Sequence, residues 1–525
     1  MAISLENQSS TTSKKPARRQ QYLCAVLALL VLATAVRIPR LSSLPPGFFV
    51  DEAVYGYEAY SISQTLHDRY GRFLPVFFRA LDDDREGTFI YLLIPFEKVF
   101  GLNEFGERLP AAIIGILTVL AVCMLARELF DDRVALLAGL MLAISPWHIH
   151  FSRIGFRAIL LPLVFTISLA LFARSFRRPW FIVWSAVAFV LCMLTYMSAR
   201  ALVPLTCCGI LLLFHRHFLA HRRQTIIACA ILLGVAAMLA PHWLSPEGLA
   251  RARHVKGMEN TTPLSLAKNY LRFLRPQFLF FGGDPNTLHT TGSIGQLLPV
   301  EVIFVPAGII ALWWRRVEAR KLMLLWLVLY PVPAFLAPSP NAIRAMEGAP
   351  LFAILSACGI AGLVQLAGRR MAPVVWSAVA MSLILSFGIY SWAYFGNYAA
   401  EAAPDFFFGM RDVLAFAESA KGKYSRVFVS DKLPFPRDYI LFYTHFPPAE
   451  FQKAPVMPSQ KTGYSMGRYD VGSVQTQDPG PSPALWLIRP TDIGALVNRQ
   501  LHWKTLYTVR EPGGPRATMA IEVMR

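Results

Sequence analysis

The sequence predicts an all-α polytopic membrane domain of about eleven transmembrane helices, followed by a small α/β domain on the outer side of the membrane. Three observations support this fold class. Hydrophobic residues make up 55% of the 525 residues. Several apolar runs exceed the roughly 18 residues that cross a bilayer. Charged residues are only 16% of the chain and are clustered, which excludes an ordinary soluble protein.

Basic residues indicate the orientation of the chain in the membrane. The formal net charge is +18, but most of the Lys and Arg residues flank apolar runs, so lipid headgroups explain them better than nucleic acid does. Basic clusters recur at the N-terminal tail and at every second loop, as the positive-inside rule requires. We therefore expect an integral protein of the plasma (inner) membrane, with residues 1–20 as a cytoplasmic tail and an extracytoplasmic C-terminal domain.

The predicted transmembrane domain covers residues 21–397. Its predicted spans are 21–37, 109–129, 133–148, 156–174, 179–197, 200–215, 224–243, 297–314, 321–338, 348–366 and 372–395. This orientation places two long loops outside, 38–108 and 244–296. No Asp, Glu, Lys or Arg lies at a span centre. Because pumps and ion-coupled transporters need ionisable groups at mid-depth, this pattern counts against transport.

Two adjacent carboxylates open the first outer loop. Asp51 and Glu52 follow the first span and precede a predicted helix, 53–66. Paired acids suit packing poorly where the chain leaves the bilayer, but they suit a catalytic base at the membrane surface. The structural alternative is a helix N-terminus with an acidic first turn, since carboxylates there accept free backbone N–H groups.

A second acidic group lies further along the same loop. It consists of Asp82, Asp83, Asp84 and Glu86 around Arg85. A predicted interfacial helix, 89–100, follows it. In a soluble protein a solvated turn would explain such a cluster, but the flanking aromatic residues favour the membrane, so we prefer a functional interpretation.

Three residues of later outer segments are also candidates. Arg344 precedes a predicted helix, where arginine is unfavourable to the helix dipole, so a phosphate contact competes with a simple positive cap. Asp284 and His289 are either turn residues or functional residues.

The C-terminal segment, 398–525, has the mixed composition of a soluble α/β domain. Its predicted elements are helices at 405–420 and 437–443, strands at 426–430 and 484–488, and a hairpin of 503–509 and 517–523. We expect residues 447–483, rich in Pro, Gly, Ser and Gln, to be loop.

Several segments resemble those of a known family. They are Asp51-Glu52-Ala53, residues 70–75, Asp84-Arg85, and residues 100–110, 145–153, 280–284 with His289, and 340–344. They are similar to the C-type (GT-C) membrane glycosyltransferases, the group of protein O-mannosyltransferases and the lipid A aminoarabinose transferase. The resemblance covers about residues 20–395 and implies the GT-C fold.

The resemblance also implies a reaction and roles for residues. A hexosyl- or pentosyltransferase of this kind moves a sugar from a polyprenyl phosphate to a hydroxyl of a protein, lipid or glycan acceptor at the outer face, with inversion. Asp51 would be the general base and Glu52 would shape its hydrogen bonds. Arg85, at a position where relatives have lysine, would bind the donor phosphate, and Arg344 and His289 would join it.

Asp84 matches a carboxylate that binds a metal in one relative. Its histidine partner would be His254 or His289, so the resemblance leaves open whether Asp84 and Asp284 contact the acceptor or hold a divalent metal, and we commit to no metal. The expected partners are the lipid-linked donor, the acceptor and membrane lipids, without nucleic acid. The alternatives are a lipid or oligosaccharide transporter of the cell envelope and a non-catalytic membrane subunit.

Overall fold

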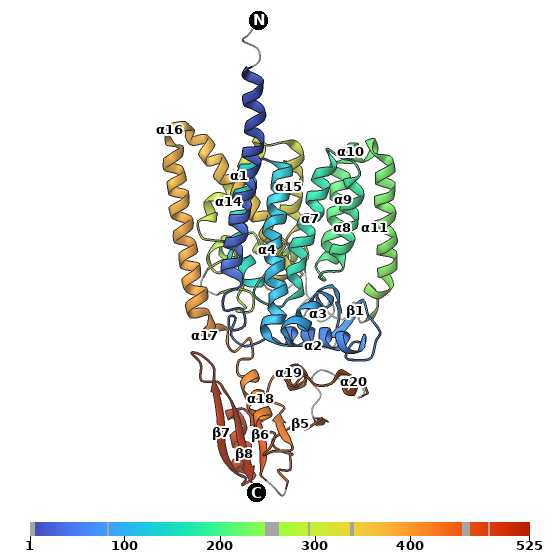
Figure 1. Cartoon of the computed structure of the whole chain (residues 1–525), viewed down its shortest axis with the longest axis vertical. Coiled ribbons are helices and arrows are strands. Elements are labelled where there is room, and N and C mark those ends of the chain that lie inside the picture. The colour runs from blue at the N-terminus through green and yellow to red at the C-terminus, as the bar shows by residue number, and fades with distance from the viewer. Residues whose placement is uncertain are drawn as a thin grey trace.

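The computed structural model describes residues 6–80, 83–246, 262–291, 294–336, 341–453, 463–480 and 483–524. A bundle of long helices occupies the middle of the molecule, and a mixed sheet lies beyond one end of it (Figure 1). The N-terminus emerges from the opposite end of the bundle. The predicted order of a helical part followed by an α/β part is confirmed.

Ten of the eleven predicted spans coincide with helix over most of their length, and of the span 321–338 the helix covers 321–329; the number of membrane crossings stays a prediction. The bundle helices are α1 (Glu6–Arg37), α4 (Glu104–Leu129), α5 (Asp132–Ala143), α7 (Leu160–Ser175), α8 (Phe181–Met193), α9 (Ala199–Leu213), α11 (Arg222–Trp243), α14 (Glu301–Ala311), α15 (Val317–Leu329) and α16 (Gly348–Trp392). Two predicted spans, 348–366 and 372–395, fall together in α16, which breaks at Gly368 (φ 67°). Glycine adopts that left-handed backbone without a Cβ clash.

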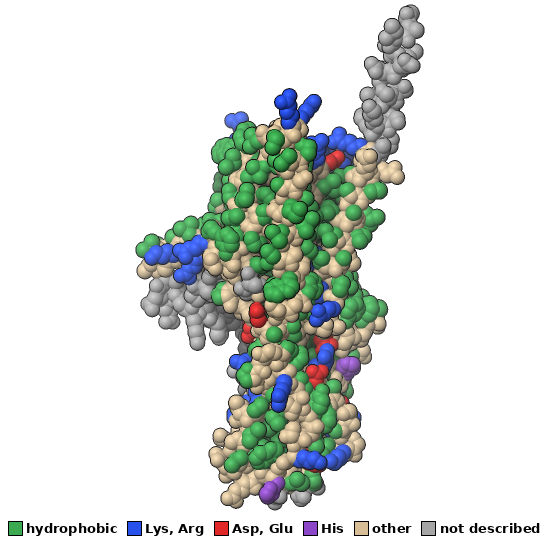
Figure 2. Space-filling view, turned by 90° about the vertical axis from the view of Figure 1, so that its left-hand side faces the viewer, with side chains coloured by type: hydrophobic (Ala, Val, Ile, Leu, Met, Phe, Trp, Pro, Cys, Tyr) green, Lys and Arg blue, Asp and Glu red, His purple; other side chains and the backbone are tan. Residues whose placement is uncertain are grey.

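The bundle has the properties of an integral membrane protein. Five described helices are long and apolar enough to cross a bilayer, and three shorter apolar helices accompany them. Figure 2 shows hydrophobic side chains spread over the outside of the bundle, with Lys and Arg side chains at the end nearest the N-terminus. Leu212, Leu233 and Ile384 are each at least 70% exposed, as residues that face lipid chains are.

Close helix packing builds the centre of the bundle. α14 lies directly against α16, and a Cβ placed on Gly308 would stand 1.9 Å from the carbonyl oxygen of Leu355. The glycine therefore allows the two backbones to touch. Short helices complete the bundle: α6 (Pro146–Phe151), α13 (Pro263–Arg272), α17 (Tyr398–Ala402) and the 3-10 helices η1 (Arg157–Ile159) and η5 (Ala342–Ala345).

The first outer loop folds into a helix, a hairpin and a second helix. These are α2 (Val50–Thr65), the antiparallel pair β1 (Phe77–Ala80) and β2 (Asp83–Glu86), and α3 (Thr88–Phe100). Asp83, Asp84, Arg85 and Glu86 form β2, so this segment is a strand rather than a solvated turn. Asp82 lies outside the described residues. The N-cap of α2 is Phe49, whose backbone N–H donates to the Glu52 carboxylate at 2.9 Å.

The C-terminal region is a six-stranded sheet with helices on both faces. The strand order is β4-β5-β3-β6-β8-β7, with β3 parallel to both β5 and β6. The described elements are α18 (Met410–Ser419), β3 (Val427–Ser430), α19 (Pro436–Tyr443), α20 (Pro448–Phe451), β4 (Tyr464–Met466), β5 (Tyr469–Gly472), β6 (Ala484–Ile488), α21 (Ile493–Asn498), β7 (His502–Arg510) and β8 (Ala517–Met524). The prediction that 447–483 is loop missed α20, β4 and β5.

The placement of α2 matters most for the site. It lies at the end of the bundle, between the membrane helices and α19 (Figure 1). One continuous apolar cluster runs from the bundle through Phe48 and Tyr57 to Tyr439 and on to Val427 of the sheet. The first outer loop is therefore enclosed on both sides.

Candidate functional site

A cavity of about 170 Å³ lies beside the N-terminus of α2. Its walls come from the first outer loop, from α6–η1, from the end of α8, and from the loops before α14 and α16. The lining residues are Phe49, Asp51, Tyr55, Phe156, Arg157, Ala158, Tyr196, Leu288, His289, Asn341, Ile343 and Arg344. Three of the predicted site residues, Asp51, His289 and Arg344, thus share one cavity although they lie far apart in the sequence.

Asp51 lies against Arg85. The Arg85 Nη1 atom is 2.8 Å from Asp51 Oδ2, and its Nε donates to Asp83 at 2.7 Å. Nη1 also donates to the Tyr55 hydroxyl at 2.8 Å. Burial alone would lower the pKa of Arg85, but Asp51, Tyr55 and Asp83 outweigh it and raise the pKa well above the usual value. Arg85 is therefore a permanent cation shared by two carboxylates.

Glu52 lies behind the cavity and does not line it. Arg108 of α4 donates to both of its carboxylate oxygens, at 2.8 and 3.1 Å. The backbone N–H groups of Phe49 and Gly155 complete its hydrogen bonds, each at 2.9 Å. Because Glu52 and Arg108 are fully buried, this bidentate pair fixes the start of α2 against α4.

Glu86 organises two further arginines. Arg157 lies 3.2 Å from its Oε2 and Arg200 lies 2.9 Å from its Oε1. Burial alone would raise the pKa of Glu86, but the two guanidiniums outweigh it and lower the pKa. The hairpin is thereby attached to η1 and α9, and the ionised Glu86 holds Arg157 at the cavity wall.

Asp284 supports His289. The His289 Nδ1 atom is 3.0 Å from Asp284 Oδ2, which also accepts the backbone N–H of Ala342 at 2.7 Å. Nδ1–H therefore donates to Asp284, and Nε2 is the ring nitrogen left for a ligand. Burial lowers the pKa of His150 to about 4, so its neutral ring donates Nε2–H to the carbonyl of Leu288 at 2.9 Å. This contact fixes the backbone next to His289.

Arg344 lies in η5, where Asn341 caps the backbone N–H of Arg344 at 3.2 Å. The backbone carbonyl of Arg344 accepts a hydrogen bond from the Ser198 hydroxyl at 3.0 Å. Across the described part of the chain its guanidinium has no carboxylate partner. Of the cavity-lining cations, Arg344 is thus available for an anionic ligand, whereas Arg157 is already paired.

Asp84 is not among the lining residues of the cavity, and it lies near His242. Its Oδ2 is 3.8 Å from His242 Nε2, and the His242 ring stacks on Phe77 at a centroid distance of 3.7 Å. Of the two histidines considered from the sequence, His289 pairs with Asp284 and His254 lies outside the described residues. Within the described ranges no group of three or more His, Cys, Asp or Glu side chains is arranged to hold a metal ion.

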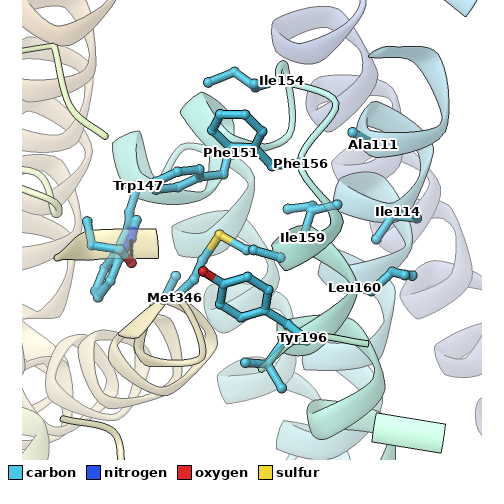
Figure 3. Packing of buried hydrophobic residues seen from close by; sticks show 14 of the residues in the cluster. Ala111, Ile114, Trp147, Phe151, Ile154, Phe156, Ile159, Leu160, Tyr196 and Met346 are labelled. Carbon is cyan, nitrogen blue, oxygen red and sulfur yellow. Dashed lines mark hydrogen bonds between the residues drawn. The ribbon is translucent and has the colours of Figure 1, made fainter. Parts of the chain in front are cut away.

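Apolar packing supports the other walls of the cavity. Phe156 and Tyr196 both line the cavity, and Met346 lies beside Tyr196 (Figure 3). Phe49 packs edge-on against Phe156 at a centroid distance of 5.6 Å. These rings restrict the access of water and leave the polar groups as the contacts for a ligand.

A second cavity, of about 330 Å³, lies among α7, α8, α9 and α11. Its lining is almost entirely apolar and includes Phe189, Met193, Val203, Cys207 and Leu232. Met193 ends α8, three residues before Tyr196 of the polar cavity. An apolar space at this position suits a hydrocarbon chain.

Sequence reasoning missed Arg157 and Tyr196. Both lie at the ends of apolar runs predicted as spans, where one polar residue is easily taken for part of the membrane helix. The signal that could have found Arg157 is its position two residues after Gly155, at the start of the run 156–174.

Comparisons with known proteins inform the fold of the chain. Residues 88–244 match the family described as dolichyl-phosphate-mannose-protein mannosyltransferase, a match that begins after Asp51 and Arg85. No curated protein matches the chain.

Among solved structures, ArnT from Cupriavidus metallidurans bound to undecaprenyl phosphate has a TM-score of 0.59 at 14% identity, over 96% of this chain and 98% of that one. Its apo state gives 0.58 at 16% identity with the same coverage. The Archaeoglobus fulgidus oligosaccharyltransferase in the apo form gives 0.49 at 15%, over 81% of this chain and 64% of that one. The likeness to ArnT over nearly full lengths shows a shared fold.

Proposed function

We propose that this chain, which has the GT-C fold of membrane glycosyltransferases, transfers one sugar from a polyprenyl-phosphate carrier to an acceptor hydroxyl at the outer face of the membrane. The observation that supports this most is the meeting of Asp51, His289 and Arg344 in a single cavity. It provides a base for the acceptor and a cation for the departing phosphate in one place. The bound lipid in ArnT is undecaprenyl phosphate, which has the carrier chemistry proposed here.

Asp51 is the proposed general base. An acceptor hydroxyl is a weak nucleophile and must lose its proton as it attacks the anomeric carbon. Before the reaction Arg85 balances two carboxylates, Asp51 and Asp83. When Asp51 takes the proton, the Arg85–Asp83 pair remains balanced, so the transfer leaves no buried charge without a partner. Arg85 then acts chiefly by orienting Asp51, and Glu52 acts by fixing the first turn of α2.

Arg344 and His289 are the proposed phosphate contacts. As the sugar–phosphate bond breaks, negative charge develops on the phosphate oxygens and needs cations already in place. The planar guanidinium of Arg344 donates two parallel hydrogen bonds. Because His289 donates Nδ1–H to Asp284, its Nε2 atom is the ring nitrogen placed toward the phosphate. One base and one anion site suit a single displacement, which inverts the anomeric carbon.

The two cavities fit a lipid-linked monosaccharide. The polar cavity, at about 170 Å³, is smaller than the roughly 300–1,000 Å³ of pockets that enclose drug-sized ligands. We therefore assign it to one sugar ring and the phosphate, rather than to an oligosaccharide. The apolar cavity beyond Met193 would take part of the prenyl chain.

The decisive experiment removes proton acceptance alone. The purified protein is incubated with a panel of polyprenyl-phosphate sugars, and released polyprenyl phosphate is measured. We expect Asp51→Asn to reduce turnover by about 10²–10⁴-fold, while the variant inserts and unfolds like the parent protein. Asp412→Asn, at an exposed ion pair with Arg411, is the matched control and should keep full turnover. Near-normal turnover by Asp51→Asn would exclude it as the base.

A further inference from the structure

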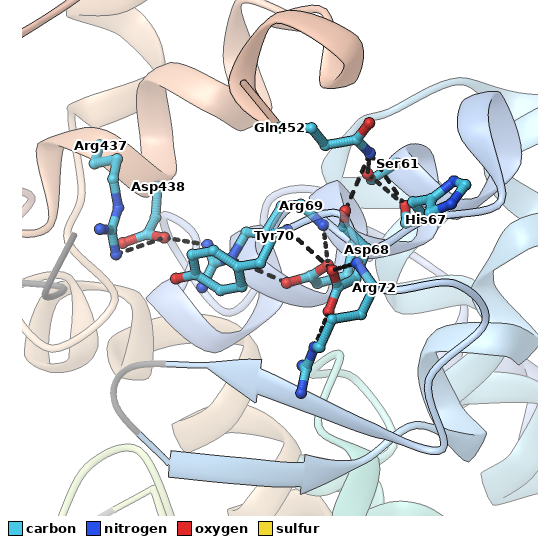
Figure 4. Close-up of polar contacts among 10 residues, drawn as sticks. Ser61, His67, Asp68, Arg69, Tyr70, Arg72, Arg437, Asp438 and Gln452 are labelled. Atoms are coloured by element: carbon cyan, nitrogen blue, oxygen red, sulfur yellow. Dashed lines mark hydrogen bonds and ion pairs between the residues drawn. The ribbon is translucent and has the colours of Figure 1, made fainter. Parts of the chain in front are cut away.

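A buried polar network joins α2 to the C-terminal region (Figure 4). Arg69, just after α2, lies 2.9 Å from Glu58 of α2 and 2.7 Å from Asp438 of α19. All three side chains are fully buried. The backbone N–H of Arg69 also donates to Glu58 at 3.0 Å. One arginine thus connects a carboxylate of each region.

Direct hydrogen bonds extend this connection along the whole of α2. At its start, Tyr439 donates its hydroxyl hydrogen to the carbonyl of Phe48, and the N–H of Phe48 donates to the carbonyl of Phe406 at 2.8 Å. In its middle, the Tyr57 hydroxyl donates to the carbonyl of Phe446 at 2.9 Å. At its end, Gln452 donates to the Thr65 hydroxyl at 2.8 Å.

The close packing of α2 against α19 disfavours sliding of α2. A Cβ placed on Gly56 would stand 2.6 Å from the ring of Phe442 in α19. Tyr57, Glu58 and Arg69 therefore meet their partners at one register only. A fully buried ionic network adds little net stability compared with apolar packing, but it penalises every arrangement in which a charge loses its partner.

The loop that carries His289 also contacts the start of the C-terminal region. Tyr398, in α17 at the start of this region, donates to the carbonyl of Thr287 at 2.8 Å. The Thr287 hydroxyl donates to Asp405. Asp51 and His289 lie far apart in the sequence, and the segments that carry them both contact the part of the chain between Tyr398 and Gln452.

We propose that the C-terminal region positions the catalytic helix, and that Asp438, Arg69 and Glu58 are positioning residues that set the register of α2 and hence the place of Asp51. This inference rests on the proposed role of Asp51 as the base. It gives the C-terminal region a part in the chemical step without any contact with substrate. A misplacement of about 1 Å at a reacting group is enough to cost about 10²-fold in rate.

The test compares Asp438→Asn with a matched control in the same region. Asp438→Asn removes the charge that Arg69 shares across the junction. Asp470→Asn makes the same chemical change at an exposed pair with Arg426, which lies on the sheet. Both variants are prepared as full chains in lipid nanodiscs, and Asp438→Glu, which keeps the charge, serves as the rescue variant.

Hydrogen–deuterium exchange of residues 49–54 gives a readout that needs no turnover. We expect Asp438→Asn to increase exchange there at least tenfold, whereas Asp470→Asn and Asp438→Glu stay within about twofold of the parent. Binding of undecaprenyl phosphate, used as the probe of the phosphate site, should stay unchanged in all three. If exchange at 49–54 does not rise in Asp438→Asn, the positioning role is overturned whatever the enzyme activity.

Kinetics provides the second readout. With a donor that the parent protein uses, Asp438→Asn should lower kcat about 10–100-fold and leave KM for the donor within about twofold. An equal change in kcat and KM, or none in either, contradicts the proposal. If exchange responds as expected but the parent protein turns over no polyprenyl-phosphate sugar, the proposed function fails and the structural coupling stands.

Discussion

At the scale of single residues, charge balance decides what the polar cavity can hold. The described lining residues include two guanidiniums, Arg157 and Arg344, and one carboxylate, Asp51. Asp51 pairs with Arg85 and Arg157 pairs with Glu86, so Arg344 is the lining guanidinium without a carboxylate partner among the described residues. A phosphate monoester supplies the missing negative charge, so the site is poised for such a ligand before it arrives.

Arg344→Ala should weaken binding of undecaprenyl phosphate by about 10–100-fold, because a hydrogen bond to a charged group contributes about 1.5–3 kcal/mol. Arg344→Lys should fall between this variant and the parent, since it keeps the charge and loses the bidentate fork. Isothermal titration in detergent micelles measures the three affinities. Arg426→Ala, at an exposed position in the C-terminal region, should bind as the parent does. Equal affinity in Arg344→Ala would remove Arg344 from the phosphate site.

The same charges predict which sugars the cavity disfavours. Asp51 is the one carboxylate among the described lining residues, and Arg85 already pairs with it. An ammonium group on the sugar would add a second excess cation beside Arg157 and Arg344 without a partner. With the prenyl chain held constant, we expect a donor with a neutral sugar to have a kcat/KM at least about tenfold higher than its amino-sugar counterpart. A preference for the amino sugar would contradict this charge argument.

At the scale of elements, the hairpin of β1 and β2 shows how buried charges fix a short structure. Four residues per strand give few backbone hydrogen bonds, and such a hairpin is marginal alone. The ion pairs of Glu86 with Arg157 and Arg200 attach it to the bundle instead. The position of Arg85, and through it that of Asp51, therefore depends on Glu86.

We expect Glu86→Gln to lower the free energy of unfolding by about 3–5 kcal/mol at pH 7, since it leaves two guanidiniums without their carboxylate. The pH dependence has a definite sign. Because the folded protein lowers the pKa of Glu86, its stabilisation is fully present above the ordinary value of 4.5 and is lost as pH falls through the lowered value. Thermal unfolding of both proteins between pH 3 and pH 8 should therefore show a stability difference between parent and variant that narrows only in acid. A difference that stays constant with pH would mean that the ionised Glu86 does not cause it.

The sequence was most informative where one element carries the signal. Hydrophobic length located each membrane helix, and alternation located β3, β6 and the β7–β8 hairpin. The sequence did not predict β4 and β5, because segments of three or four residues with Gly and Ser resemble loop. β5 is a strand because it pairs with β3, and β4 because it pairs with β5. The sequence did not predict the β1–β2 hairpin because its strands are also short and because acidic residues are rare in strands.

The sequence predicted the candidate site in part. Asp51 and Arg85 stood out as charges in an apolar setting, and they do lie in contact. That His289 and Arg344 would meet Asp51 depends on how the helices pack, which local sequence does not encode. The pairing of Glu52 with Arg108 was equally hidden, because it joins two helices over 56 positions.

At the scale of the whole molecule, one apolar core runs from the membrane helices to the sheet. Its members include Leu355 in the bundle, Phe48 and Tyr57 in the first outer loop, and Val429 and Leu487 in the C-terminal region. The opposite face of the sheet has its own cluster, around Trp486 and Ile521. A shared core explains why the C-terminal region can hold α2 firmly enough to influence the cavity.

The orientation of the whole chain is open to a direct chemical test. All seven cysteines lie in apolar bundle helices, so an impermeant maleimide should react with introduced cysteines only. Lys423→Cys marks the C-terminal region at a side chain that is 64% exposed. Arg177→Cys marks the opposite end, at a side chain that is 63% exposed. In intact spheroplasts we expect Lys423→Cys to be labelled and Arg177→Cys to be protected until the membrane is opened. The reverse pattern would place Asp51 on the cytoplasmic side, where an outer-face transferase cannot operate.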